Sequence, residues 1–400
     1  MRRIDLKKVQ VARSSTIRDI NRQIVLNYVR DREPISRAEI ARETELQRST
    51  ISTIVEDLKS DGLIEEIGEG ESTGGRRPTL LRLRAAGAMA IGVDITPTCT
   101  TIATGDLGGR VLEREEFPHI EQPEQLYARV IESVRRLAAK AGERKIEAVG
   151  VSLPGLVDPD SGRAVYIPWF NWRDWPIAAE ISGATGLDVI IDNDANAAAL
   201  AALWFGRQEL REARDVIMVL VAEGIGTGIV VDGQIYRGER GGAGEFGHMI
   251  VGERGPVACS CGNHDCWEAF ASGRAAVARY LQDGGASVED GVRIDFTQVV
   301  ERALAGEARA IHALNETAHY LGIGISNLIV GLSPEAVVVG GVIARAWPLV
   351  ANALSETIQR SVRRGLPSAR IMPSILGDQP TLMGAISLVL ARKFASVASS

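Results

Sequence analysis

In residues 86–400, short apolar segments alternate with helical patterns, and several of these segments run into glycine or a carboxylate. Such segments indicate buried strands, and strands that alternate with helices favour an α/β fold with ligands at the strand ends. The clearest cases are residues 90–94, 146–153, 189–191, 215–221 and 337–341. The glycine turns at Gly224–Gly228 and Gly340–Gly341 together favour a nucleotide cleft between two lobes. Either turn alone is more often only a tight turn.

The first 85 residues follow a different pattern. Residues 17–32 carry a helical apolar stripe that Pro34 ends, and Ser36 with Glu39 three residues later forms a capping box that starts a second helix. A third helix follows and ends at Gly62. Two short helices across a tight turn predict a helix-turn-helix, and residues 63–83, with their Gly-rich centre, predict a β-hairpin wing.

The third helix is the candidate recognition helix for double-stranded DNA. Small, polar or basic side chains at its start suit base edges and phosphates, and an arginine pair at the wing tip suits phosphates or a minor groove. The predicted DNA-binding residues are Arg48, Ser49, Thr50, Ser52, Thr53, Arg76 and Arg77. A helical module that binds another protein is the alternative interpretation.

Charge and composition limit the class of protein. The chain carries 45 Lys+Arg and 51 Asp+Glu, but its first 86 residues carry 17 Lys+Arg against 14 Asp+Glu, so a mildly basic head precedes an acidic body. No apolar stretch of about 18 residues predicts a membrane span, and the N-terminus has no apolar signal core. We therefore expect a cytoplasmic protein without a membrane partner. Four cysteines are too few for a disulfide framework in 400 residues.

Three of the cysteines lie close together in the sequence, after a histidine. His248, Cys259, Cys261 and Cys266 supply one imidazole and three thiolates, a donor set that suits closed tetrahedral zinc. A loop rich in Gly, Asn and Asp needs an ion to order it. We predict one structural zinc per chain, because no ligand position is left for an activated water. The alternative is three free thiols in a surface loop.

Several motifs identify the chain as similar to the ROK family (repressors, open reading frames, kinases), and to its repressor branch. The motifs are SRAEIA, STIS, GGRRP, PGLVD, NDANAAAL, GIGTGIVVDG, GGAGEFGH, CSCGNHDCWE and VVVGG, in family order along the chain. The resemblance implies a winged helix-turn-helix (α+β) followed by an α/β two-lobed actin-like sugar-kinase (ribonuclease H-like) fold. We expect the DNA-binding domain at 1–85 and the sensor domain at 86–400, with lobe one at about 86–205 plus helix 381–396 and lobe two at about 206–380.

The resemblance also implies a sugar site. The residues of the family that bind sugar hydroxyls correspond here to Asn193, Asp194, Glu245, His248 and Glu268. Carboxylates accept hydrogen bonds from hydroxyls, and an Asn side chain both donates and accepts. His248 would then serve zinc and sugar together. Asp194 also opens an Ala-rich helix, so the alternative is that it acts only as a helix N-cap.

Two departures from the family pattern concern this site. Where the family often reads Asn-Leu-Gly-Trp, residues 169–172 read Trp-Phe-Asn-Trp, so Trp169 replaces the usual Asn. Trp169, Trp172 and Trp175 either stack on a sugar face or pack in the core. ROK kinases carry Asp-x-Gly-Gly-Thr at the first strand, whereas residues 94–98 read Asp-Ile-Thr-Pro-Thr, and Pro97 has no N–H for a phosphate.

Asp194, the equivalent of the kinase general base, is still present, but the phosphate-binding turn is altered. We therefore predict a sugar-binding transcriptional repressor of carbohydrate-utilisation genes that is not an enzyme, working as a homodimer or homotetramer on operator DNA. The effector is a sugar or a sugar phosphate. An active ATP-dependent sugar kinase and a regulator controlled by docking to a transport protein are the alternatives.

Overall fold

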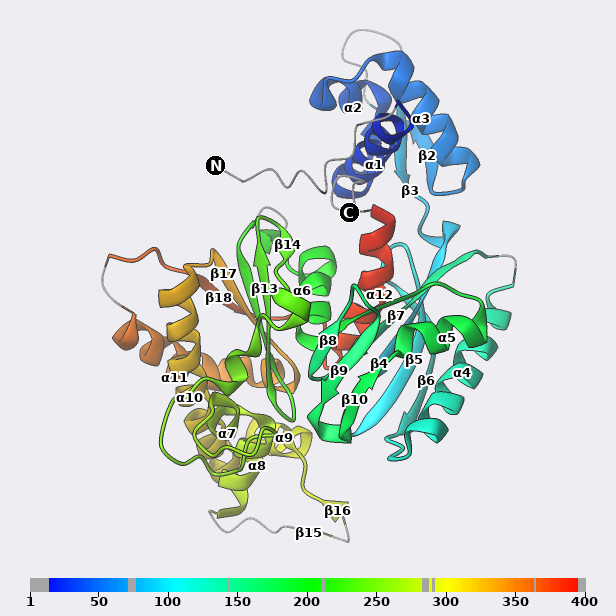
Figure 1. Cartoon of the computed structure of the whole chain (residues 1–400). Helices are drawn as coiled ribbons and strands as arrows, with labels where there is room; N and C mark the ends of the chain where they lie inside the picture. Colours follow the sequence, from blue (N-terminus) through cyan, green and yellow to red (C-terminus); the bar gives the residue numbers. More distant parts are fainter. Residues whose placement is uncertain are drawn as a thin grey trace.

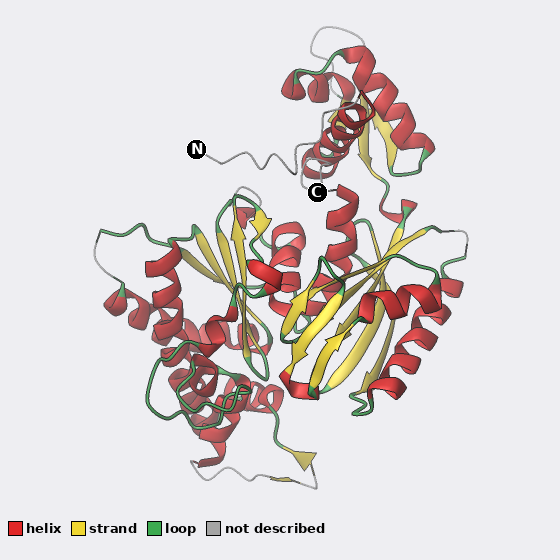
Figure 2. Cartoon of the chain, in the orientation of Figure 1, coloured by secondary structure: helices red, strands yellow, loops and turns green. Residues whose placement is uncertain are grey.

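A small N-terminal head lies on a larger body made of two lobes (Figure 1). The computed structural model describes residues 14–70, 77–142, 144–210, 213–282, 288–289, 292–362 and 365–394. Each lobe contains a central sheet with helices packed around it (Figure 2). Among these residues, no helix is both long enough and apolar enough to cross a bilayer.

The head is a winged helix-turn-helix. Its elements are α1 (Ser14–Arg32), β1 (Ile35–Ser36), α2 (Arg37–Thr44), α3 (Arg48–Ser60), β2 (Ile64–Glu69) and β3 (Thr79–Leu83). The sheet order is β1-β3-β2, and β2 and β3 form the antiparallel wing. The predicted capping box is confirmed, because Ser36 Oγ accepts from the Glu39 N–H and the Ser36 N–H donates to the Glu39 carboxylate. These bonds fix the start of α2, and four apolar residues of α3 (Ile51, Ile54, Val55 and Leu58) are buried in the head.

Lobe one is built on a mixed sheet. Its strands are β4 (Met89–Ile95), β5 (Cys99–Asp106), β6 (Val111–Pro118), β7 (Ile146–Leu153) and β11 (Val189–Asn193), in the order β11-β7-β4-β5-β6. A smaller sheet holds β8 (Leu156–Asp158), β9 (Arg163–Ile167) and β10 (Trp172–Trp175). The helices are α4 (Pro123–Lys140), α5 (Ile177–Thr185), α6 (Asp194–Phe205) and, from the end of the chain, α12 (Pro380–Phe394).

Lobe two repeats the chain path of lobe one. Its sheet runs β14-β13-β12-β17-β18, so in both lobes the first strand in sequence lies at the centre and forms a hairpin with the second. The strands are β12 (Val216–Val221), β13 (Ile225–Val231), β14 (Gln234–Ile235), β17 (Ala336–Gly340) and β18 (Arg370–Pro373). The helices are α7 (Trp267–Ala271), α8 (Gly273–Gln282), α9 (Phe296–Leu304), α10 (Ala308–Leu332) and α11 (Trp347–Ser361), and β15 (Val288–Glu289) pairs with β16 (Val292–Arg293). This repetition is the two-lobed actin-like arrangement that the family resemblance implies.

Helices α6 and α12 lie side by side at the centre of the molecule (Figure 1). A Cβ at Gly384 of α12 would lie 2.4 Å from the carbonyl carbon of Ala197, so only glycine allows these two helices to approach so closely. On its other side α6 packs against β12 and β13 of lobe two. The Ala-rich sequence of α6 therefore suits a helix that contacts both lobes.

Contacts of α1 with α6 and α12 hold the head to lobe one. Asn27 Nδ2 donates to the backbone oxygen of Phe394 (3.0 Å), and the guanidinium of Arg30 lies 4.3 Å from the ring centre of Trp204 and 5.1 Å from that of Phe394. Buried apolar residues of the head and of α12 form one continuous cluster. The head is thus joined to the last turn of α6 as well as to α12.

Candidate functional site

A cleft of about 830 Å³ opens between the two lobes. Lobe one lines it with the β4–β5 turn and the start of α6, and lobe two lines it with the β12–β13 turn, the short helix η5 (Glu245–His248) and the start of α7. The residues that the family resemblance assigns to sugar line this one cleft: Asn193, Asp194, Glu245, His248 and Glu268. The fold thus brings together residues separated by up to 75 positions in the sequence.

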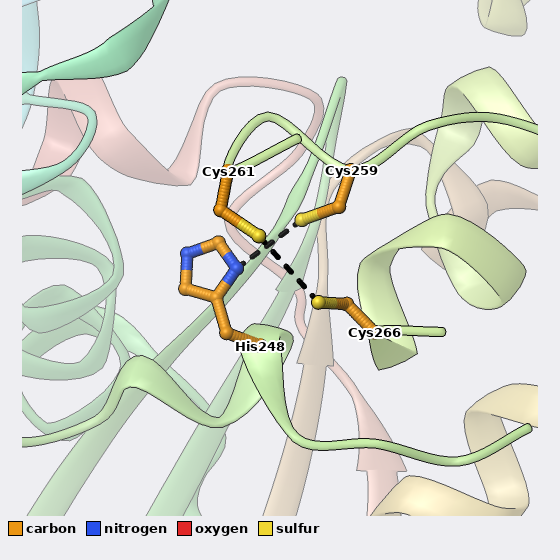
Figure 3. A group of neighbouring side chains, drawn as sticks. All are labelled: His248, Cys259, Cys261 and Cys266. Atoms are coloured by element: carbon orange, nitrogen blue, oxygen red, sulfur yellow. Dashed lines mark hydrogen bonds between the residues drawn. The ribbon is translucent and has the colours of Figure 1, made fainter. Parts of the chain in front are cut away.

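The four residues predicted to bind zinc converge at one side of the cleft (Figure 3). Their ligand atoms all lie within 4.8 Å of one another, with His248 Nδ1 3.2 Å from Cys259 Sγ and Cys261 Sγ 3.6 Å from Cys266 Sγ. Cys259 and Cys266 are buried and Cys261 is exposed. One imidazole and three sulfurs in this arrangement could hold a metal ion.

Local structure fixes the cysteines in place. Cys266 is the N-cap of α7, and its neighbour in an isolated antiparallel bridge is Ile250, two residues after His248. The Cys259 N–H donates to the backbone oxygen of Asn263, and Gly262 closes this turn at φ +93°. Burial raises the pKa of the Cys266 thiol, so the thiolate needs a cation beside it.

Glu268 ties the cysteine loop to lobe two. Its Oε1 accepts from the Ser260 N–H (2.8 Å), from Cys259 Sγ (3.3 Å) and from Arg274 (3.1 Å), while Oε2 accepts from the Ile225 N–H (3.3 Å). Gly224 makes room for it, because a Cβ there would lie 2.4 Å from Glu268 Oε2. Glu268 is only 4% exposed, and both of its oxygens already have protein partners. Its first role is therefore to hold the floor of the cleft.

His248 faces the cysteines with one ring nitrogen and Glu245 with the other. Nε2 lies 3.5 Å from Glu245 Oε2, on the opposite edge of the ring from Cys259. Burial and the nearby Glu268 raise the pKa of Glu245, and His248 opposes this shift. Occupancy of the cysteine cluster and the position of Glu245 are therefore coupled through one imidazole.

The N-cap of α6 is Asn193, and Asp194 is the first residue of the helix. Asn193 Oδ1 accepts from the N–H groups of Ala195 and Asn196, and its Nδ2 donates to the Gly155 oxygen, so this side chain mainly orders the helix start. Asp194 Oδ1 accepts from the Ala195 N–H (2.8 Å). Burial, followed by repulsion from Asp94, raises the pKa of Asp194 to about 7.

Gly224 and Gly226 line the cleft, and the glycines of β13 also have a packing role. Gly226 and Gly228 lie within strand β13, and added Cβ atoms would lie 2.8 Å from Ala195 Cβ and 2.3 Å from Ala195 O. They allow β13 to pack directly on α6. A phosphate-binding turn and a tight strand–helix contact both require glycine, so the sequence alone did not separate them.

Three contacts of the site carry no local signal in the sequence. Thr381 Oγ1 donates to Asp94 Oδ2 (2.6 Å) across 287 positions, and burial raises the pKa of Asp94 to about 6. Arg237 pairs with the buried Asp192 (2.7 Å) behind the start of α6. Arg274 lies over the ring of Trp169 at 4.8 Å.

The three tryptophans that were predicted either to stack on a sugar or to pack in the core lie in different environments. Trp169 lines the cleft, next to Gly224. Trp172 is buried in the core of lobe one, and the indole N–H of Trp175 donates to Glu180 (2.7 Å). Only Trp169 of the three therefore presents a ring to the cleft.

The residues predicted to contact DNA lie along one face of α3. Arg48, Ser49, Ser52 and Thr53 are exposed, and Thr50 is half-buried. The hydroxyls of Ser52 and Thr53 donate to the carbonyls of Arg48 and Ser49 one turn earlier. In the wing, Arg77 is exposed and Arg76 lies outside the described residues.

Comparison with known proteins finds a matching family model for each of the two parts of the chain. The chain belongs to the ROK family, whose model matches residues 90–392, and the MarR family model matches residues 24–77. The xylose repressor of Bacillus subtilis (strain 168) is 29% identical over 387 residues, which cover 96% of this chain and 98% of that protein.

Solved structures extend the comparison. A ROK family transcriptional regulator, a homolog of the E. coli MLC protein, has a TM-score of 0.79 at 27% identity, covering 95% of this chain and 97% of its own. A ROK family glucokinase from Streptomyces griseus, in complex with glucose and AMPPNP, has a TM-score of 0.67 at 30% identity, covering 75% of this chain and 99% of its own. The fold of the body is thus shared by regulators and kinases, and only the site can separate the two functions.

Proposed function

We propose that this protein is a transcriptional repressor of carbohydrate-utilisation genes, with a head that binds operator DNA and a cleft that binds a sugar effector. One structural observation carries the proposal: α6 begins in the cleft at Asp194 and ends beside Arg30 of the head. A single rigid helix thus connects the effector site to the DNA-binding head. The similarity to a xylose repressor over nearly the whole chain supports this proposal.

In this proposal the sugar hydroxyls donate to Asp194 and Glu245, and His248 contacts both the sugar and the metal. Glu268 and Asn193 act mainly by holding the cleft in shape, since their polar atoms already bond to the protein. Closure of the lobes around the sugar shifts α6 and α12, and with them the head. The effector must therefore bind the two states of the cleft with different affinity.

We further propose that the body does not transfer phosphate. At the β4–β5 turn the Thr96 N–H donates to the Cys99 oxygen (2.9 Å), and the Cys99 N–H donates to Thr96 Oγ1 (3.1 Å). Pro97, between them, has no N–H. The turn thus points its donors inward and offers little to an ATP phosphate, which supports a sensor over a kinase.

Direct tests separate the proposal from its alternatives. The purified protein selects its operator from genomic fragments, and fluorescence anisotropy then measures operator affinity with and without a panel of sugars. Release of the operator by one sugar, with no ADP formed from ATP, is the expected result. ADP formation with that sugar would establish a kinase, and an operator affinity indifferent to every sugar but changed by a transport protein would establish the docking regulator.

The metal, the assembly and the compartment complete the proposal. Cys₃His sites are typical of zinc, so we assign His248, Cys259, Cys261 and Cys266 to one structural zinc per chain. A winged helix-turn-helix reads two half-sites as a dimer, so we propose a homodimer or a homotetramer. A repressor acts where the chromosome is, and we therefore place it in the cytoplasm.

Removal of the Arg48 side chain is expected to weaken operator binding about 10-fold, because it takes one cation from the exposed start of α3. Anisotropy titrations of Arg48→Ala at several salt concentrations measure this loss and the accompanying decrease in salt dependence. Arg129→Ala is the matched control, since Arg129 lies on α4 and pairs with Glu132. Equal operator affinities for the two variants would remove Arg48 from the interface.

Substitution of Arg30 tests the connection between cleft and head. In Arg30→Gln the cation over Trp204 and Phe394 is lost, so we expect the sugar to change operator affinity at least ~3-fold less than in the unaltered protein. Arg32→Gln, which changes an exposed arginine at the end of the same helix, is the control. A full sugar response in Arg30→Gln would mean that the signal takes another route.

A further inference from the structure

Acidic side chains far outnumber basic ones in the lining of the cleft. Among the residues that the structure describes, its lining includes seven carboxylates and no Lys or Arg. The acidic residues are Asp94, Asp194, Glu223, Glu245, Glu268, Asp295 and Asp378. They come from both lobes, so closure of the cleft brings negative charges toward each other. The raised pKa of Asp194, caused in part by Asp94, reflects this crowding.

The arginines nearest to this lining are already used by carboxylates. Arg274 pairs with Glu268 (3.1 Å) and lies over Trp169, and Arg345 pairs with Asp378 (3.6 Å). A zinc ion bound by three thiolates and one neutral imidazole adds a net charge of about −1, so the metal does not reverse the sign. The cleft therefore stays negative when the metal site is filled.

Backbone donors at the start of α6 and in the β4–β5 turn do not replace the missing cations. The first N–H groups of α6 are taken by Asn193 Oδ1 and Asp194 Oδ1, and those of the β4–β5 turn point inward. At the start of α12, Thr381 donates to Asp94, so a carboxylate already lies there. Each of these three places in the cleft is a helix end or a turn, the kind of position at which a phosphate group binds when its donors are free.

We propose that the effector is an uncharged sugar and that sugar phosphates are excluded from this cleft by charge. The inference rests on the proposed function and narrows its ligand class. Hydroxyl groups donate to carboxylates, so a neutral sugar uses the acidic lining as its set of acceptors. A phosphate group brings a charge of about −1.5 to −2 and normally requires Arg, Lys or free N–H groups. The ring of Trp169 adds an apolar surface that suits the C–H face of a sugar.

Calorimetric titration of the full-length, zinc-loaded protein tests this inference. D-xylose, D-glucose and N-acetylglucosamine are each compared with their own monophosphates in a buffer that contains Mg²⁺, so that a metal-bridged phosphate would register as binding. We expect at least one neutral sugar to bind and its monophosphate to bind at least ~100-fold more weakly. A monophosphate that binds as tightly as its parent sugar overturns the inference but leaves a sugar-responsive repressor. No binding by any sugar, in either form, refutes both.

Two exposed substitutions at the rim give a matched control on charge. Asp378→Asn removes one negative charge from the rim and leaves Arg345 paired with Glu301 alone, whereas Arg345→Gln removes the cation beside Asp378. We expect monophosphate affinity to rise about 3-fold in the first variant and to fall in the second, with both shifts reduced by added salt. Identical monophosphate affinities in the two variants would show that charge does not set the exclusion.

Discussion

Replacement of Cys266 by serine is expected to release the metal and to lower the affinity of the cleft for its sugar at least ~100-fold. Cys266 is 1% exposed, begins α7 and faces the other sulfurs, so a serine there leaves a zinc site with three ligands. Binding of a structural zinc is coupled to local folding, and Glu268 follows Cys266 by two residues. Metal analysis by mass spectrometry and calorimetry with the sugar measure the two losses.

The control for this variant is Cys99→Ser. Cys99 is half-buried at the start of β5 and lies outside the cluster, so zinc content should stay unchanged. Because Cys99 also lines the cleft, this variant is a control for metal content alone. Operator binding in the absence of sugar should also survive in Cys266→Ser, because the core of the head is built from its own helices and α12. A Cys266→Ser protein that keeps one zinc per chain and its sugar affinity would contradict the structural role of this residue.

The sequence predicts best those features that depend on neighbours along the chain. The capping box at Ser36 and Glu39 and the metal ligands at 248–266 are local patterns, and the structure brings each set together. The same holds for the alternation of strands and helices, which predicts an α/β body. In each case the residue types and their spacing along the chain are enough to predict the local structure.

Contacts between distant segments were not predictable in this way. The bond from Thr381 to Asp94 depends on α12 returning to lobe one, and the ion pair of Arg237 with Asp192 joins residues 45 positions apart. The family resemblance marks Asn193 as a sugar residue, but it does not reveal that its polar atoms already cap α6. Whether a polar side chain is available to a ligand depends on its other partners, which only the fold supplies.

Substitution of Asp194 by asparagine is expected to abolish most sugar binding and, at the same time, to stabilise the protein at high pH. Burial and, after it, repulsion from Asp94 raise the pKa of Asp194 to about 7, because both disfavour the charged form. Its carboxyl therefore binds a proton more tightly when folded. The free energy of unfolding therefore falls as the pH rises from about 4 to about 7. Above about pH 7 it stays lower by the full cost of burying the ionised carboxylate. Asparagine has no charge to bury, so it avoids this cost.

We expect the gain in unfolding free energy of Asp194→Asn over the unaltered protein to be about 2 kcal/mol larger at pH 8 than at pH 5. Urea unfolding at the two pH values gives this difference, in which effects independent of pH cancel. Asp192→Asn is the matched control: Asp192 is 1% exposed and pairs with Arg237, so its loss should destabilise the protein at both pH values. If Asp194→Asn gained less stability at pH 8 than at pH 5, the folded state would favour the ionised form of Asp194 over the protonated form. In that case Asp194 would be an ordinary helix-start residue, and not a buried carboxyl group that lowers stability in order to bind the sugar.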